Sequence, residues 1–144
     1  MYYLLYRSQA TEALNAAQLT CLLEQAREFN LRHNLTGLLL YTTDHQFLQV
    51  FEGDKQAVRT AYYESIVHDS RHHDCFVLSE GLWRHGSFPD WSMAFLTPEH
   101  EVLPRKPGLL AISQLHRVLS VVARAHPGLS QLLLNFVERY EPIS

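Results

Sequence analysis

The chain has 144 residues, of which 47% are hydrophobic and 19% are charged, and its formal net charge is −3. This composition is typical of one globular domain with a sizeable core and argues against disorder. The small negative charge, without a run of Lys and Arg, argues against sequence-independent binding of nucleic acid. No apolar stretch approaches the length of a membrane span. We therefore expect neither a nucleic-acid partner nor a membrane segment.

The cysteines and the N-terminus indicate the compartment. Cys21 and Cys75 are isolated in the sequence, so they indicate neither a disulfide framework nor a cysteine zinc site. Residues 1–7 lack the basic start and the long apolar core of a signal peptide. We predict a cytoplasmic protein.

The first two thirds of the chain alternate between strand and helix signals. Short aromatic and aliphatic runs indicate strands, and apolar residues three and four positions apart indicate helices. The predicted elements are a strand at 2–7 with a loop at 8–12, a helix from the N-cap Asn15 to about Arg32, a hairpin of strands at 35–41 and 46–51, a helix that follows Gly53 and ends near Asp69, and strands near 75–83 and 91–96. This βαββαββ order predicts an α+β fold, a ferredoxin-like sheet with both helices on one face.

A second region begins near Pro98, and residues 104–108 have the composition of a linker. The expected division is a main domain over 1–100 and a linker with a helical extension over 101–144. The extension is predicted to hold two apolar helices separated by Pro127-Gly128, at 109–122 and 129–137. Because about 36 residues rarely fold alone, we expect this helical pair to cover the sheet face left open by the first two helices.

Gln49 stands where an apolar residue would be expected. Side chains alternate between the faces of a strand, so Phe47, Gln49 and Phe51 share one side while Leu48 and Val50 share the other. A buried primary amide needs polar partners, since each unpaired group costs roughly 1–3 kcal/mol. Gln49 therefore predicts a polar site inside the apolar interior.

Two further polar residues in apolar surroundings belong with Gln49. Tyr6 lies on the first strand, which neighbours the third in a ferredoxin-like sheet, and Asn30 lies in the last turn of the facing helix. Each alone is explained as a structural residue whose hydrogen bonds are made within the protein. Together they outline a planar polar site that suits a flat heteroaromatic ligand. The expected flanks are Leu38, Leu40 and Ile66.

Enzyme and metal templates match poorly. The glycines form neither G-x-G-x-x-G nor a Walker loop, and no nucleophile motif is recognisable. His68 and His72 have the i, i+4 spacing of a helical metal pair, but no further matched pair accompanies them. The dipole of the preceding helix explains His72 and His73 adequately, so we expect no metal.

Five short motifs follow one another from residue 2 to about residue 97. They are Leu4-Leu5-Tyr6-Arg7-Ser8, then Phe29-Asn30 with Leu35-Thr36-Gly37-Leu38-Leu39-Leu40-Tyr41, then Phe47-Leu48-Gln49-Val50-Phe51-Glu52-Gly53, then Ile66-Val67-His68-Asp69-Ser70-Arg71-His72, and Phe88-Pro89-Asp90-Trp91-Ser92-Met93. Their order and spacing resemble the BLUF domain, a family of blue-light sensors that use FAD.

The resemblance implies a non-covalent flavin, FAD or alternatively FMN, between the two helices. It implies that Tyr6 donates an electron and a proton to the photoexcited flavin and that Gln49 rearranges its hydrogen bonds. Trp91 and Met93 lie on the strand expected to carry the signal onward. The other implied flavin-binding residues are Asn30, Ile66, Asp69, Arg71 and His72.

The chain departs from the family pattern at three positions. Phe29 stands where an asparagine is common, and Ser65 and Gly86 stand where basic residues are often found, which weakens the expected grip on the ribityl phosphate. The hairpin loop and the second helix each have about one residue more than usual.

We expect a blue-light photoreceptor that is not an enzyme and has no enzymatic output domain. Its signal would leave through a protein partner or through a homo-oligomer formed by the C-terminal helices. The alternative is a small ferredoxin-like flavin-dependent redox enzyme with His72 or His85 as the acid-base group. A cofactor-free interaction module would explain the helical extension but would leave Gln49 without a purpose.

Overall fold

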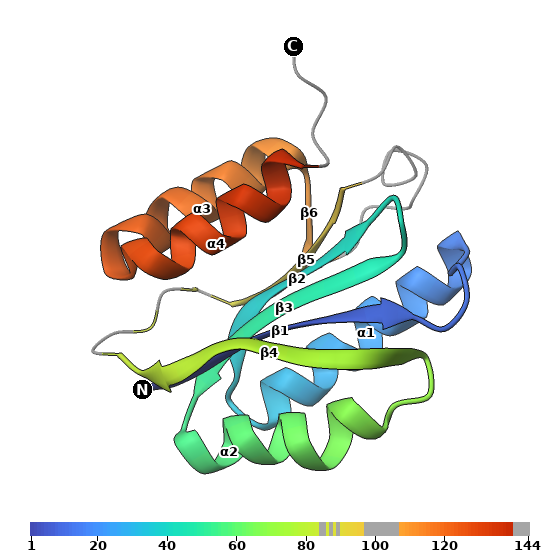
Figure 1. Cartoon of the computed structure of the whole chain (residues 1–144), viewed down its shortest axis with the longest axis horizontal. Helices are drawn as coiled ribbons and strands as arrows, with labels where there is room; N and C mark the ends of the chain where they lie inside the picture. Colours follow the sequence, from blue (N-terminus) through green and yellow to red (C-terminus); the bar gives the residue numbers. More distant parts are fainter. Residues whose placement is uncertain (84–85, 87, 89, 97–106, 140–144) are drawn as a thin grey trace.

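The computed structural model describes residues 1–83, 86, 88, 90–96 and 107–139. In this part of the chain, six strands form one sheet, in the order β4-β1-β3-β2-β5-β6. Helices α1 and α2 cover one face of the sheet, and α3 and α4 cover the other (Figure 1). The elements are β1 (Tyr2–Ala10), α1 (Ala16–Arg32), β2 (Thr36–Thr42), β3 (Gln46–Gly53), α2 (Lys55–Thr60), β4 (His72–Leu82), β5 (Trp91–Leu96), β6 (Leu109–Leu110), α3 (Ile112–Ala125) and α4 (Pro127–Glu138).

This architecture confirms the predicted ferredoxin-like fold with two helices on one face and the helical pair on the other. Strand β1 lies between β3 and β4 and is antiparallel to both, while β2 is antiparallel to β3 and parallel to β5. The adjacency of β1 and β3 places Tyr6 directly opposite Gln49. None of the helices in the described ranges is long and apolar enough to cross a bilayer.

Strand β1 is longer than predicted. Residues 8–10 were expected in a loop, but Gln9 and Ala10 pair with His73 and His72 of β4 and extend the strand. Because β4 starts earlier than its apolar run suggests, it supplies backbone partners for this end of β1.

The helical extension begins with a short strand, which the sequence did not predict. Leu109 and Leu110 were expected to open the first apolar helix, but they pair in parallel with Met93 and Ala94 as β6. The edge of β5 presents unpaired N–H and C=O groups, and pairing with them outweighs the helical pattern of two leucines.

A side-chain cap fixes the start of α1. The Asn15 Oδ1 accepts a hydrogen bond from the Gln18 N–H at 2.8 Å, and the Gln18 Oε1 accepts one from the Asn15 N–H at 2.9 Å. This reciprocal pair is a capping box, and it confirms Asn15 as the N-cap.

The second helix changes its hydrogen-bond pattern before it ends. After the α-helical part of α2, the chain forms a π-helical turn at Ala61–Ser65 and a 3-10 turn at Ile66–His68. A π-helical turn holds more residues than an α-helical turn. A π-helical turn at this point would accommodate the extra residue expected in this helix before Ile66.

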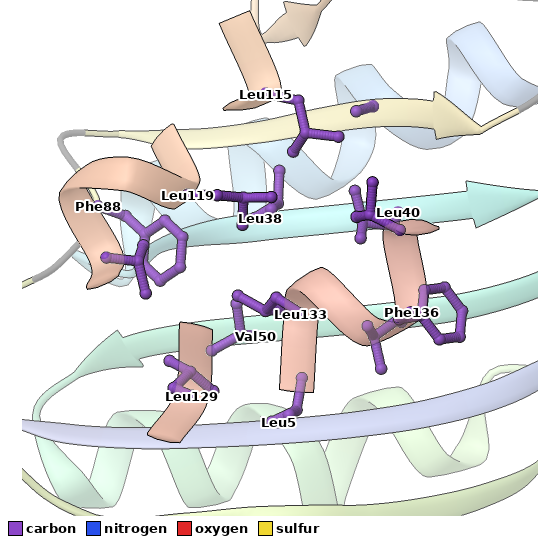
Figure 2. Packing of buried hydrophobic residues seen from close by; sticks show 14 of the residues in the cluster. Leu5, Leu38, Leu40, Val50, Phe88, Leu115, Leu119, Leu129, Leu133 and Phe136 are labelled. Atoms are coloured by element: carbon purple, nitrogen blue, oxygen red, sulfur yellow. The ribbon is translucent and has the colours of Figure 1, made fainter. Parts of the chain in front are cut away.

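The sheet separates two hydrophobic layers. On one side, α3 and α4 pack onto the strands, with Leu133 of α4 near Val50 of β3 and Leu119 of α3 near Leu38 of β2 (Figure 2). This packing confirms that the helical extension covers the face left open by α1 and α2. The opposite layer contains Leu39, Phe47 and Met93 and holds the polar residues singled out by the sequence.

Candidate functional site

A cavity of about 250 Å³ lies between the sheet and the first two helices. The structure brings to its walls every residue predicted to bind a flavin, namely Tyr6, Asn30, Gln49, Ile66, Asp69, Arg71 and His72. The remaining lining residues are Leu22, Gln25, Ala26, Phe29, Leu39, Phe47 and Ser65. The sequence therefore located the cavity, while the roles of these residues toward a flavin stay predictions.

The expected flanks are correct only in part. Ile66 lines the cavity, but Leu38 and Leu40 face the helical extension on the other side of the sheet. The β2–β3 register explains this error, because Leu39 is the residue opposite Gln49. Residues directly opposite each other in neighbouring strands point to the same face.

Tyr6 and Gln49 are joined by a buried hydrogen bond. The Tyr6 hydroxyl donates to the Gln49 Oε1 at 2.6 Å, and the two residues are 3% and 5% exposed. Burial raises the pKa of the Tyr6 phenol well above its usual value of 10, with smaller contributions from Cys75, Tyr62 and Asp69. The phenol is therefore a proton donor held against the amide oxygen.

Two buried amides keep hydrogen-bonding capacity for the cavity. Gln49 uses its oxygen for Tyr6, and its NH₂ group makes no hydrogen bond to the described residues. The side-chain amide of Asn30, which is 5% exposed, also makes none within the described ranges. Buried amides without partners cost free energy, so both groups favour a ligand with a complementary polar edge.

Arg71 is held at the cavity wall by two side chains. Its guanidinium forms a bidentate pair with the Asp69 carboxylate, at 3.0 Å from Nε to Oδ1 and 2.6 Å from Nη2 to Oδ2. Its Nη1 donates to the Gln25 Oε1 at 2.9 Å. Hydrogen bonding to Arg71 lowers the pKa of the Asp69 carboxyl, so this pair stays charged at neutral pH.

His72 has both ring nitrogens engaged by the protein. Its Nε2–H donates to the Ile66 carbonyl at 2.5 Å, and in the neutral ring Nδ1 accepts from the Ser8 hydroxyl at 2.7 Å. Neither nitrogen is left for the acid-base role of the redox-enzyme alternative. The other candidate for that role, His85, lies outside the described residues.

The helical metal pair considered in the sequence is wrong. His68 ends the 3-10 turn and His72 begins β4, so the two residues do not share one helix face. The described part of the chain contains no cluster of three or more His, Cys, Asp or Glu side chains suited to a metal ion.

Helix α1 and the sheet share the apolar walls, with Leu22, Ala26 and Phe29 on α1 and Leu39 and Phe47 on the strands. Phe29, in the position where the family often has asparagine, lines the cavity, and its ring centroid lies 4.3 Å from that of His33. Ser65 also lines the cavity. Gly86 lies elsewhere, where an added Cβ would be 3.3 Å from Oε1 of Glu52.

Met93 is in the same cross-strand row as Tyr6 and Gln49. Trp91 and Met93 are both fully buried on the cavity side of the sheet. Trp91 is opposite Gly37, two positions away from this row. Across the sheet, the row consists of Tyr6, Gln49, Leu39, Met93 and Leu109.

Sequence reasoning missed three residues that shape the site. Ser8 binds His72, Gln25 binds Arg71, and Leu39 forms the wall beside Gln49. Ser8 could have been found, because it lies two residues after Tyr6 and so on the same strand face. Gln25 carried no comparable signal, since a polar residue on a surface helix is ordinary.

The cavity fits a flat heteroaromatic ring. Its walls include apolar side chains from α1 and the sheet, and the amides of Asn30 and Gln49 supply donors and acceptors at its polar edge. An isoalloxazine ring has this character, with one apolar end and one end rich in carbonyl and nitrogen groups.

The comparisons with known proteins identify the family. A sequence model of the BLUF family, described as sensors of blue-light using FAD, matches residues 1–94. The chain is 29% identical over 138 residues to photoactivated adenylate cyclase subunit beta of Euglena longa, which covers 95% of this chain and 15% of that protein.

Solved structures show the same similarity. BlrP1 of Klebsiella pneumoniae has a TM-score of 0.70 at 25% identity, over 95% of this chain and 34% of that one. The BLUF protein BlrB in its dark state has a TM-score of 0.58 at 26% identity, over 91% of this chain and 82% of that one. The chain therefore spans about a third of BlrP1, about a seventh of the Euglena protein and most of BlrB.

Proposed function

Since this chain belongs to the BLUF family of blue-light sensors, we propose that Tyr6 and Gln49 are its photoactive pair and that its cavity binds FAD without a covalent bond. The observation that carries this proposal is the buried 2.6 Å hydrogen bond between the two residues at the cavity wall. When bound, the flavin absorbs blue light and supplies the oxidant.

Tyr6 and Gln49 would provide the switch. In the dark, burial keeps the proton on the Tyr6 oxygen. A phenol that loses an electron becomes a strong acid, and the Gln49 Oε1 lies at the end of its hydrogen bond. Gln49 has an acceptor end and a donor end, so rotation or tautomerisation of its amide changes the hydrogen bonds offered to the cavity.

The other predicted binding residues would hold the ring. Asn30 offers a donor and an acceptor, while Arg71, fixed by Asp69, offers positive charge, and Ile66 and His72 complete the wall. The cavity of about 250 Å³ lies below the roughly 300–1,000 Å³ of sites that enclose a whole drug-sized ligand. We infer that the ring is enclosed and the phosphates lie outside. The choice of FAD over FMN rests on the family.

The signal would leave through β5. Met93 is the better candidate than Trp91, because it shares the cross-strand row of Tyr6 and Gln49. The row ends at Leu109 in β6, just before α3. A change at Gln49 therefore has a short path, through Leu39 and Met93, to the start of the helical extension.

An effector would receive the signal. The Euglena relative is named as a subunit of an adenylate cyclase, and this chain matches 15% of its length. We propose that the chain itself acts as the sensor, without catalysis of its own. The effector is a partner protein, a second copy bound through α3 and α4, or another part of a longer protein.

The test is the visible absorption spectrum of the protein, loaded with FAD, before, during and after blue illumination. A flavin spectrum that shifts slightly to the red and recovers in darkness is expected. A bound flavin whose spectrum does not shift would favour the redox-enzyme alternative. A protein that cannot be loaded with flavin would contradict the proposed cavity.

Gln49→Leu should abolish the red shift and leave the flavin bound, because it removes the switch and retains an apolar wall. The matched control is Gln46→Leu, three residues earlier on β3 and outside the cavity, which should keep the shift. A Gln49→Leu protein with the normal photoproduct would exclude this role for Gln49.

A further inference from the structure

Glu52 is a buried charged residue that the proposed photochemistry does not use. It lies on β3, three residues after Gln49, and its exposed fraction is 0%. Among the residues that the structure describes, no other buried residue is charged. Carboxylates are rarely buried without compensating hydrogen bonds, so its partners indicate its purpose.

The Glu52 carboxylate joins three segments. Its Oε1 accepts hydrogen bonds from the Phe88 backbone N–H at 2.8 Å and from the Thr36 hydroxyl of β2 at 3.0 Å. The backbone of Gly86 also lies close, since a Cβ added there would be 3.3 Å from this oxygen. The carboxylate therefore binds β3 and β2 to Phe88, which precedes β5 in the chain.

Phe88 connects this point to the helical extension. It is 5% exposed and belongs to the layer under α3 and α4, where Figure 2 shows it beside Leu119. It also lies three residues before Trp91, the first residue of β5. The hydrogen bond from Phe88 to Glu52 thus fixes the position of a residue that packs under α3. Phe88 also lies just before the first residue of β5, the proposed signalling strand.

The entry of β5 is held from the cavity side as well. Arg27 of α1 forms an ion pair with Asp90 at 3.1 Å and donates to the Trp91 carbonyl at 3.1 Å. Side-chain alternation places Glu52 on the opposite face from Gln49. Arg27 and Glu52 therefore hold the start of β5 from the two layers.

We propose that Glu52 is a positioning residue for signal transfer, whose carboxylate ties the strand that carries Gln49 to Phe88, which precedes β5 and packs under α3. This inference rests on the proposed function. Glu52 does not line the cavity, so the photochemistry is independent of it. The coupling between the switch and the extension depends on it.

The test compares Glu52→Met with Glu52→Gln in the full chain loaded with FAD. Methionine has a similar length and no oxygen acceptor, while glutamine keeps an oxygen for the Phe88 N–H. Two readouts are needed: the flavin red shift, and the light-minus-dark difference in amide hydrogen exchange of β5, α3 and α4. Glu52→Met should keep the red shift and lose the exchange difference, and Glu52→Gln should keep both.

Thr36→Val is the matched control, because it removes the bond within the sheet and leaves the one to Phe88. It should keep the exchange difference. If Glu52→Met does not fold, Glu52→Asp replaces it; its carboxylate is one methylene shorter, and the same loss is expected.

Three results would overturn the proposal. They are a normal exchange difference in Glu52→Met, an equal loss in Thr36→Val, and a wild-type protein that shifts to the red with no exchange difference. Failure of the red shift in the wild type would instead contradict the proposed function.

Discussion

At the scale of single residues, removing the hydroxyl of Tyr6 tests its photochemical role while the buried ring stays in place. Tyr6→Phe keeps the buried ring and removes the proton donor, so the flavin should bind and the red shift should be lost. The Gln49 oxygen would lose its partner, which should lower the free energy of unfolding by about 1–3 kcal/mol. Urea unfolding in the dark and difference spectroscopy measure these effects.

Tyr63→Phe is the control for this change. Tyr63 is 40% exposed and its hydroxyl donates to Glu80 at 3.3 Å, so the loss of stability should stay within about 0.5 kcal/mol. A Tyr6→Phe protein that still forms the red-shifted state would rule out the proton and electron donor proposed here.

The buried phenols also predict instability in alkali. The pKa of Tyr6 is raised well above 10, and burial raises that of Tyr62 to about 12. The unfolded chain loses these protons first, near pH 10, so their contribution to stability is complete below pH 10 and is lost as the pH rises further. The free energy of unfolding should fall more steeply above pH 10 in the wild type than in Tyr6→Phe. Equal slopes would contradict this explanation.

The sequence predicted the site residues whose position follows from alternation and strand order. Tyr6 and Gln49 meet because β1 and β3 are neighbours, which the βαββαββ order implies. The error at Leu38 and Leu40 arose because the register of the hairpin, unlike its existence, depends on how the turn is made. The burial of Glu52 was not predictable, because its partner Phe88 is distant in the sequence.

At the scale of elements, Gly37 allows β2 and β3 to approach closely. An added Cβ would lie 2.1 Å from the Val50 carbonyl oxygen and 2.8 Å from the Phe51 Cα, and backbone atoms cannot move aside cheaply. Gly37→Ala should therefore displace the strand that carries Gln49. We expect at least the roughly 1–3 kcal/mol typical of overpacking, together with a weaker light response.

Gly81→Ala is the matched control for Gly37→Ala, because its nearest neighbour would be the Tyr3 ring at an ordinary 3.6 Å. Thermal unfolding compares the two variants. Equal melting temperatures would show that the close approach at Gly37 is not required.

Helices and strands were predictable where apolar residues recur at regular spacing over a long segment, as in α1. They were not predictable where pairing with a distant strand determines the structure. Leu109 and Leu110 form β6 only because the edge of β5 is available to them. The π-helical turn Ala61–Ser65 was foreshadowed only by the extra residue in the second helix. Its apolar spacing alone is equally suited to an α-helix.

At the scale of the whole molecule, the proposed flavin cavity and the helical extension lie on opposite faces of one sheet. Leu133 of α4 is 1% exposed and packs near Val50 (Figure 2), so Leu133→Ala should lower the free energy of unfolding by about 2–5 kcal/mol. The flavin spectrum in the dark should not change, because the cavity lies on the other face. Leu132→Ala, at a residue that is 43% exposed, is the control with little expected effect.

Strand β3 places the proposed input and the helical extension on neighbouring residues. Gln49 belongs to the cavity layer and the very next residue, Val50, belongs to the layer under α3 and α4. Consecutive residues of a strand are joined by one planar peptide unit, so a displacement of the backbone at Gln49 also displaces the Cα atom of Val50. The sheet that separates the cavity from the core under α3 and α4 is one backbone thick. A shift of β3 at Gln49 would therefore act on both sides of the sheet without an intervening element.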